Sequence, residues 1–181
     1  MPSSPLLLRP GTPADLPAMR DIYADAVQHG TGTFELEVPD AAEFARRRDE
    51  VLARGLPWLA AERDSRVLGY AYAAPFRPRP AYRYCVEDSI YLHPQARGAG
   101  VGRLLLAELL ARCQAAGARQ MLAVIGDSAN LGSIGVHRAL GFEPCGLLRT
   151  VGWKCDRWLD VVLMQRPLGA GAATAPAADA A

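Results

Sequence analysis

The chain has 181 residues and a formal net charge of +1, and it is 50% hydrophobic and 22% charged. This length and composition suit one globular domain with a sizeable core. The near-neutral charge excludes binding of nucleic acid by phosphate attraction alone, although a small anionic ligand needs only a local positive site.

The predicted elements alternate between strand and helix. In chain order they are a strand at 6–9, a helix from the N-cap Thr12 to 29–30, a helix opened by 40–43 and ended by Gly55, strands at 58–62, 67–73 and 84–92, a helix at 104–113, a strand at 121–125, a helix at 133–140, and strands at 146–151 and 159–165. Phe44, Val51 and Leu52 should face the core from the second helix. The three prolines within 75–80 remove backbone donors, so this stretch should be a stiff loop.

This order predicts an α/β domain over residues 1–168, with local parallel pairing in its second half. Residues 169–181 are almost entirely Ala and Gly. Such a segment buries too little apolar surface to offset the entropy of ordering, and we expect a disordered tail.

The cysteines and the hydropathy of the chain indicate whether a metal site is expected and in which cellular compartment the protein should lie. The four cysteines stand far apart, none of them in a C-x-x-C pair, and there are three histidines. This argues against a zinc cluster and favours reduced thiols. Residues 6–8 are too short a run for a secretory signal, and no apolar run is long enough to span a bilayer. We therefore expect a cytoplasmic protein with no metal, nucleic acid or membrane partner.

Residues 93–102 join a predicted strand to a predicted helix and carry glycine at positions 98, 100 and 102. Small residues let backbone N–H groups approach a ligand, and the helix start adds a positive dipole end. This chemistry suits a phosphate or pyrophosphate, to which Arg97 and Arg103 can add charge. The spacing fits neither a Walker A loop nor the G-x-G-x-x-G dinucleotide fingerprint. A glycine turn without a ligand is the alternative.

Residues 95–102, followed by Leu104-Leu105, resemble the Q/R-x-x-G-x-G/A signature of the GNAT superfamily of N-acetyltransferases, and residues 130–142 resemble its closing motif. The chain is most similar to the phosphinothricin and methionine sulfoximine acetyltransferase branch. The residues that carry this likeness are Thr33-Phe34-Glu35, Gly69-Tyr70-Ala71-Tyr72-Ala73, Phe76-Arg77, Glu87-Asp88-Ser89-Ile90-Tyr91, Val124-Ile125-Gly126, Gly152-Trp153-Lys154 and Trp158-Leu159-Asp160-Val161. The likeness covers residues 6–168.

The resemblance implies a twisted mixed sheet of about six to seven strands flanked by about four helices. Two parallel strands, 84–92 and 121–125, should splay apart and hold acetyl-CoA, the co-substrate, with one strand pairing to the pantetheine as an added strand would. The cofactor residues expected on this basis are Ile90, Tyr91, Leu92, Arg97, Gly98, Ala99, Gly100, Val101, Gly102, Arg103, Asn130 and Ser133. The last two are helix caps on the alternative interpretation. A homodimer is also implied, and Trp153 and Trp158 would suit its interface.

Attack of an amine on a thioester needs a base, an oxyanion donor and a proton for the thiolate. Glu87 is the candidate base, because the resemblance implies a base there and partial burial would raise its pKa. Period-two alternation places Asp88 on the other face of the strand. His137 is the candidate acid, since histidine titrates near neutrality, and Tyr91 is the second candidate. Structural roles for Glu87 and His137 are the alternatives.

The acceptor site is expected near Arg77 and Arg79, because a fixed guanidinium suits a carboxylate or phosphinate. The full set of predicted acceptor residues is Phe34, Glu35, Tyr72, Arg77, Arg79, Glu87, Asp88 and Ser89. The alternatives are solvated surface positions for the two arginines, a second-subunit contact for Phe34 and Glu35, and core packing for Tyr72. The resemblance implies small amino-acid-like acceptors such as phosphinothricin, methionine sulfoximine and methionine sulfone. Two alternatives stay open. One is another amine, for which a polyamine site should be acidic and a peptide site an open groove. The other is a non-catalytic acyl-CoA sensor.

Overall fold

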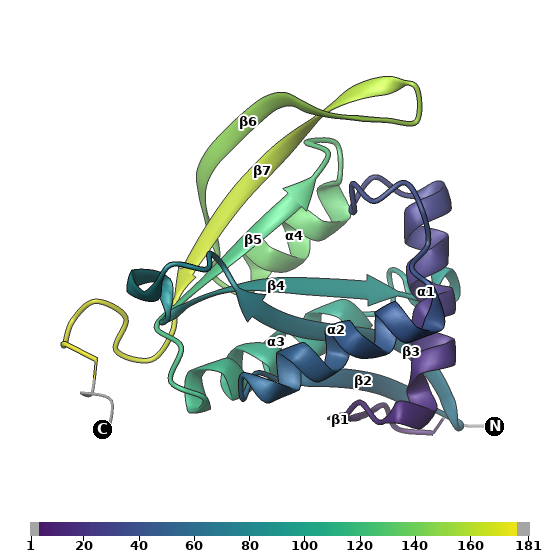
Figure 1. Cartoon of the computed structure of the whole chain (residues 1–181), viewed down its shortest axis with the longest axis horizontal. Coiled ribbons are helices and arrows are strands. Elements are labelled where there is room, and N and C mark those ends of the chain that lie inside the picture. The colour runs from purple at the N-terminus through teal and green to yellow at the C-terminus, as the bar shows by residue number, and fades with distance from the viewer. Residues whose placement is uncertain (1–3, 177–181) are drawn as a thin grey trace.

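A seven-stranded mixed sheet organises the chain, in the order β1-β2-β3-β4-β5-β7-β6 (Figure 1). The structure is a computed structural model that describes residues 4–176. The strands are β1 Leu7–Pro10, β2 Trp58–Arg63, β3 Arg66–Pro75, β4 Cys85–Leu92, β5 Gln120–Gly126, β6 Glu143–Lys154 and β7 Arg157–Pro167. Neighbouring strands are antiparallel, except that β4 and β5 are parallel. The predicted fold class, with its central parallel pair, is confirmed.

Four α-helices cover the two faces of the sheet: α1 Leu16–His29, α2 Ala41–Ala53, α3 Val101–Ala115 and α4 Leu131–Ala139. Single turns of 3-10 helix are η1 Pro13–Asp15, η2 Pro80–Tyr82 and η3 Pro94–Ala96. Side chains alternate between the faces of a strand, so Ala60 and Tyr70 join the core under α1 and α2, while Ala61 and Ala71 join the core under α3. The sheet is therefore buried on both faces near its centre.

The predicted helix ends have the expected capping chemistry. Asp15 accepts a hydrogen bond from the Thr12 backbone N–H at 2.7 Å, and Asp40 accepts one from the Glu43 N–H at 2.8 Å. The prediction that Leu52 faces inward is wrong, since that side chain is 39% exposed. The buried residues of helix α2, Phe44 and Val51, lie on one stripe of this amphipathic helix, and Leu52 lies outside that stripe.

The segment after β7 makes specific contacts with the domain over its described part. Leu168 is buried, and the Gly169 N–H donates to Gln114 at 3.1 Å. Arg119 donates to the carbonyl oxygens of Gly171 at 2.9 Å and Thr174 at 2.6 Å. This differs from the disorder predicted from residue 169 onward, because one arginine satisfies several backbone carbonyls at once. Residues 177–181 lie outside the described part of the chain.

Candidate active site

The parallel strands β4 and β5 separate soon after they begin. They pair at Cys85–Gln120, Val86–Met121 and Glu87–Leu122, and the register records no pair beyond that point. A cavity of about 790 Å³, here called the cleft, lies where the strands diverge. Of the predicted site residues, those that line it are Phe34, Glu35, Tyr72, Glu87, Asp88, Ser89, Ile90, Tyr91, Leu92, Arg97, Gly98, Gly102, Asn130, Ser133 and His137.

The glycine turn stands at one end of the cleft. Gly98 and Gly100 have φ values of 77° and 79°, which favour glycine, and a Cβ on either would meet nothing within 4 Å. Helix α3 begins directly afterwards at Val101, with Gly100 as N-cap. An open, bare turn leading into a 15-residue helix fits a phosphate group, because backbone donors and the helix dipole face the same space.

Neighbours of the turn contribute in different ways. Arg97 lines the cleft, and its guanidinium is held by Asp25 of α1 at 2.6 Å. Arg103 and Ala99 are exposed and lie outside the lining of the cleft. The side chain of Val101 is buried in the core, so this residue offers a ligand only its backbone. Arg97 is therefore the side chain of the turn best placed for a charge interaction.

Glu87 is the last β4 residue paired to β5, and its side chain is half-buried at the rim of the cleft. Burial raises the pKa of this carboxyl above its usual range, the adjacent Asp88 charge raises it further, and Arg77 lowers it. A carboxylate with a raised pKa that stays accessible has the properties of a general base.

Asp88 and His137 form a buried pair across the base of the cleft. His137 Nε2 lies 3.0 Å from Asp88 Oδ2, and Nδ1 donates to the Ser133 carbonyl at 2.7 Å. Since both ring nitrogens face acceptors, the ring fits the protonated form. Burial alone would lower the pKa of His137, but the hydrogen bond and charge of Asp88 together with the Ser133 carbonyl leave it raised. Asp88 Oδ1 is buried with no partner among the described residues.

Tyr91 packs in an aromatic cluster beside the cleft. Its ring lies edge-on to Tyr23, with centroids 4.8 Å apart, and stacks on Tyr70 at 5.3 Å. Burial, followed by the charges of neighbouring groups, raises the pKa of the Tyr91 phenol well above its usual range. The hydroxyl is consequently a neutral donor at any physiological pH.

The loop between α1 and α2 closes one side of the cleft. Lys154 donates to the Thr33 carbonyl at 2.8 Å, and a Cβ on Gly152 would overlap the ring of Phe34. Glu35 is held by an ion pair with Arg47 of α2 at 2.6 Å. The C-terminal strands thus seat Phe34, and α2 orients Glu35.

Other predicted residues have local roles or lie elsewhere. Asn130 is the N-cap of α4 and accepts from the Ser133 N–H at 3.2 Å, as the capping alternative expected. Arg77 and Arg79 line a second, larger groove instead of the cleft. Arg77 remains close enough to Glu87 to act on its pKa.

The family model described as "Acetyltransferase (GNAT) family" matches residues 16–142, which is more than half of the chain. The chain belongs to the GNAT acetyltransferase family. This match spans the splayed strands, the glycine turn and α4, the elements that form the cleft.

Several relatives of this acetyltransferase share nearly its whole length. It is 54% identical over 162 residues to a phosphinothricin N-acetyltransferase of Alcaligenes faecalis, covering 90% of this chain and 82% of that protein. It is 41% identical to an L-methionine sulfoximine/L-methionine sulfone acetyltransferase of Pseudomonas paraeruginosa, covering 84% and 88%. A solved structure of a phosphinothricin acetyltransferase from Sinorhizobium meliloti in complex with AcCoA superposes with a TM-score of 0.93 at 48% identity, covering 99% and 95%.

Two residues that orient this acetyltransferase's site escaped the sequence analysis. Arg47 and Asp25 lie on helices far from the motifs they support, and a helical charge is usually a solvated surface group.

Across the described residues, no group of three or more metal-ligand side chains comes together, and no helix is long and apolar enough to cross a membrane.

Proposed function

We propose that this acetyltransferase moves the acetyl group of acetyl-CoA to the amine of a small amino-acid-like acceptor, such as phosphinothricin, methionine sulfoximine or methionine sulfone. The single observation that carries the proposal is the half-buried Glu87 at the rim of the cleft, where β4 and β5 part. The names of the relatives support the acceptor class.

Acetyl-CoA enters the cleft with its pyrophosphate at the glycine turn and Arg97. The pantetheine runs along the backbone of Ile90 to Leu92, whose side toward β5 has no recorded strand partner among the described residues. The thioester then lies near Glu87, the last residue before the strands diverge. This arrangement uses backbone donors for binding, as strand addition does.

Catalysis proceeds by direct attack. Glu87 removes a proton from the acceptor ammonium, the amine nitrogen attacks the thioester carbonyl, and the C–S bond breaks as the amide forms. The leaving thiolate takes a proton, for which His137 and Tyr91 are the candidate donors. Both line the cleft, and the pKa of each is raised above its usual value, which favours the protonated form. Arg77 receives the carboxylate or phosphinate of the acceptor, since it carries charge beside Glu87.

The direct test of this function uses the purified protein, acetyl-CoA and a panel of amines that contains the three named acceptors, common amino acids and a polyamine. We expect thiol release to be fastest with the amino-acid analogues that carry a tetrahedral polar group. Thiol release with the polyamine alone would contradict the proposed acceptor class. A complete absence of thiol release with every amine on the panel would contradict it too.

The glycine turn provides a prediction for cofactor binding. Gly98→Val should raise the KM for acetyl-CoA about tenfold or more, because a branched side chain disturbs donors that contact the pyrophosphate. Gly55→Val is the matched control. Gly55 also has a positive φ of 69° with nothing within 4 Å of a Cβ, but it stands at the end of α2. KM for acetyl-CoA is measured from initial rates. Equal KM values in the two variants would show that the glycine turn is not part of the cofactor site.

We also propose a cytoplasmic homodimer. The end of the β6–β7 hairpin carries Trp153 and Trp158, 54% and 59% exposed, with ring centroids 5.3 Å apart. Leu148 and Val151 extend this apolar surface. An exposed aromatic pair on a long hairpin is typical of a protein interface.

A further inference from the structure

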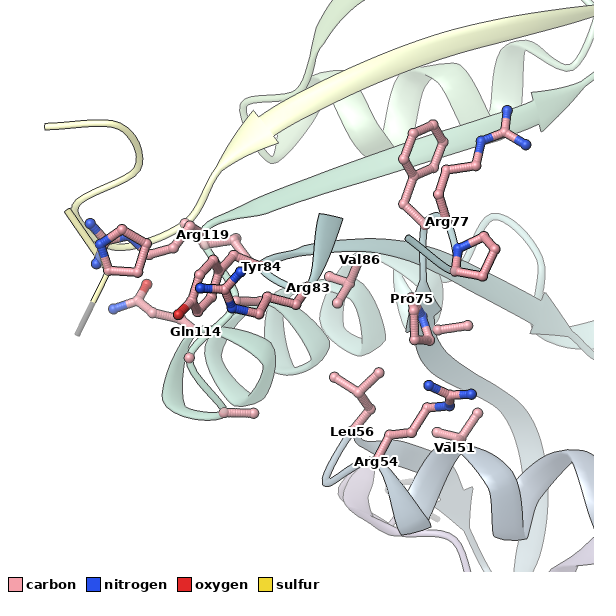
Figure 2. A pocket seen from close by; sticks show the side chains of 18 of the residues that line it. Val51, Arg54, Leu56, Pro75, Arg77, Arg83, Tyr84, Val86, Gln114 and Arg119 are labelled. Carbon is pink, nitrogen blue, oxygen red and sulfur yellow. The ribbon is translucent and has the colours of Figure 1, made fainter. Parts of the chain in front are cut away.

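A second groove of about 1150 Å³ lies beside the cleft, between α2, the loop after β3, the start of β4 and the end of α3. Figure 2 shows the guanidinium groups of Arg54 and Arg77 beside it. Within residues 4–176, no carboxylate forms an ion pair with either of them. Arg47 of α2 lines the same groove, but Glu43 holds it at 2.8 Å and Glu35 at 2.6 Å. Since Glu35 lines the cleft, Arg47 supports the wall of the active site from behind.

The backbone at Glu35 is fixed by neighbouring elements. Thr33 Oγ1 accepts a hydrogen bond from the Glu35 N–H at 3.3 Å and lies 3.0 Å from the Tyr23 hydroxyl of α1. The Thr33 carbonyl accepts from the ammonium of Lys154, at the end of β6, at 2.8 Å. Arg47 then binds Oε1 of the Glu35 side chain, which leaves Oε2 for a second partner. A carboxylate held at its backbone and at one oxygen is preorganised to bind a ligand.

The cleft lining within residues 4–176 carries four carboxylates, which are Glu35, Glu87, Asp88 and Asp127. Asp88 is buried in its pair with His137, and Asp127 is paired with an arginine of β7 at 2.5 Å. Glu87 is the proposed base. Glu35 is 37% exposed, and its partner Arg47 stands outside the cleft lining. Glu35 is thus the carboxylate best placed to bind a cation that enters the cleft.

Glu35 and Glu87 lie within electrostatic reach of the same hydroxyl, that of Tyr72, which also lines the cleft. Burial raises the pKa of Tyr72, and a hydrogen bond with Ser89 lowers it. The charge of Arg47 lowers this pKa too, whereas the charges of Glu35 and Glu87 raise it. The two carboxylates therefore approach one region of the cleft from two elements, the loop before α2 and strand β4. An amine cation in that region is attracted by both.

We propose that Glu35 binds the ammonium group of the acceptor, and that Arg47 is a positioning residue that determines specificity for cationic amines by holding Glu35 in place. The inference rests on the proposed function, because it concerns the same acceptor site. Binding and proton removal are divided between two carboxylates. Glu35 accepts a hydrogen bond from one N–H of the ammonium, and Glu87 takes the proton of another. The nitrogen keeps its bond to Glu35 while the freed lone pair attacks the thioester.

The test measures binding to the full chain saturated with CoA by titration calorimetry, for phosphinothricin and for its 2-hydroxy analogue, which lacks the ammonium. Glu35→Gln should weaken binding of phosphinothricin about tenfold or more, the contribution of a hydrogen bond between charged groups. Arg47→Met should weaken it about threefold to tenfold, because the carboxylate stays but is no longer held. Arg47→Lys should recover part of this loss. Binding of the 2-hydroxy analogue should match the wild type in every variant.

Arg46→Met is the matched control. Arg46 precedes Arg47 on α2 and also pairs with Glu43, at 2.8 Å, and its second carboxylate partner, Glu50, lies on the same helix. The two methionine substitutions therefore remove comparable ion pairs from α2, and we expect similar urea midpoints for both. Only Arg47→Met should change the affinity for phosphinothricin.

The outcomes separate this inference from the proposed function. Equal affinities for phosphinothricin in Arg47→Met and Arg46→Met, or tighter binding in Arg47→Met, overturn the positioning role. Wild-type affinity in Glu35→Gln, or equal losses for the two ligands, overturns ammonium binding by Glu35. If the expected binding pattern holds but the wild type releases no thiol from acetyl-CoA with any acceptor, the proposed function fails and the inference stands. An enzyme that binds neither ligand overturns both.

Discussion

Replacing Glu87 by glutamine should lower kcat about 10²- to 10⁴-fold, the contribution of a positioned general base. Glutamine keeps the size and polarity of the side chain but has no lone pair basic enough to take an ammonium proton. The wild-type rate should fall on the acid side as pH drops through the raised pKa of Glu87, above the usual value of about 4.3. Initial rates from pH 4 to 9 should show this limb in the wild type and not in Glu87→Gln.

The matched control is Glu37→Gln, an exposed carboxylate in the loop between α1 and α2 that forms no ion pair within residues 4–176. It should retain the wild-type rate and pH profile. If Glu87→Gln turns over at the wild-type rate, the amine is deprotonated elsewhere and Glu87 is a structural residue.

Removing the imidazole of His137 should destabilise the protein by about 3–5 kcal/mol, because the variant leaves the Asp88 carboxylate buried without a partner. The side chains of the pair are only 5% and 3% exposed. His137→Leu should therefore lower the urea midpoint strongly, and adding Asp88→Asn should recover part of the loss by removing the unpaired charge. A double-mutant cycle measured by urea unfolding gives the coupling.

The same pair predicts how stability depends on pH. A raised folded pKa means that the stabilisation from His137 is complete below about 6.5, the unfolded value, and is lost as pH rises through the folded pKa. The decline above about pH 6.5 should disappear in His137→Leu. His29→Leu is the control, since its contact with Asp25 at 3.3 Å involves a 71% exposed side chain and such pairs contribute little. Equal losses from both variants would contradict a stabilising buried pair.

Local rules predicted the parts of the site that depend on sequence neighbours. Period-two alternation separated Glu87 from Asp88, and spacing identified the bare turn at Gly98 and Gly100. In the structure Asp88 meets α4 while Glu87 faces the cleft rim. Both features follow from backbone geometry within a few residues, which a sequence displays directly.

Features that depend on tertiary packing could not be predicted from the sequence. Nothing in the pattern around Arg97 indicates that Asp25, 72 positions earlier, holds it. Arg77, expected in the acceptor site, lines the neighbouring groove while its charge still acts on Glu87, and nothing in the local sequence pattern indicates this placement. Likewise, composition suggested no contact for residues 169–174, yet Arg119 supplies donors to their carbonyls.

The early separation of β4 and β5 gives the sheet two inner edges. Strand edges normally lie at the outside of a sheet, where their open amide groups are a template for pairing with other chains. Here the open edges of β4 and β5 face each other across the cleft, with β3 and β7 covering their other sides. The fold therefore keeps two open strand edges inside its own sheet, between β3 and β7, and the proposed mode of cofactor binding uses the β4 edge as a partner for the extended pantetheine.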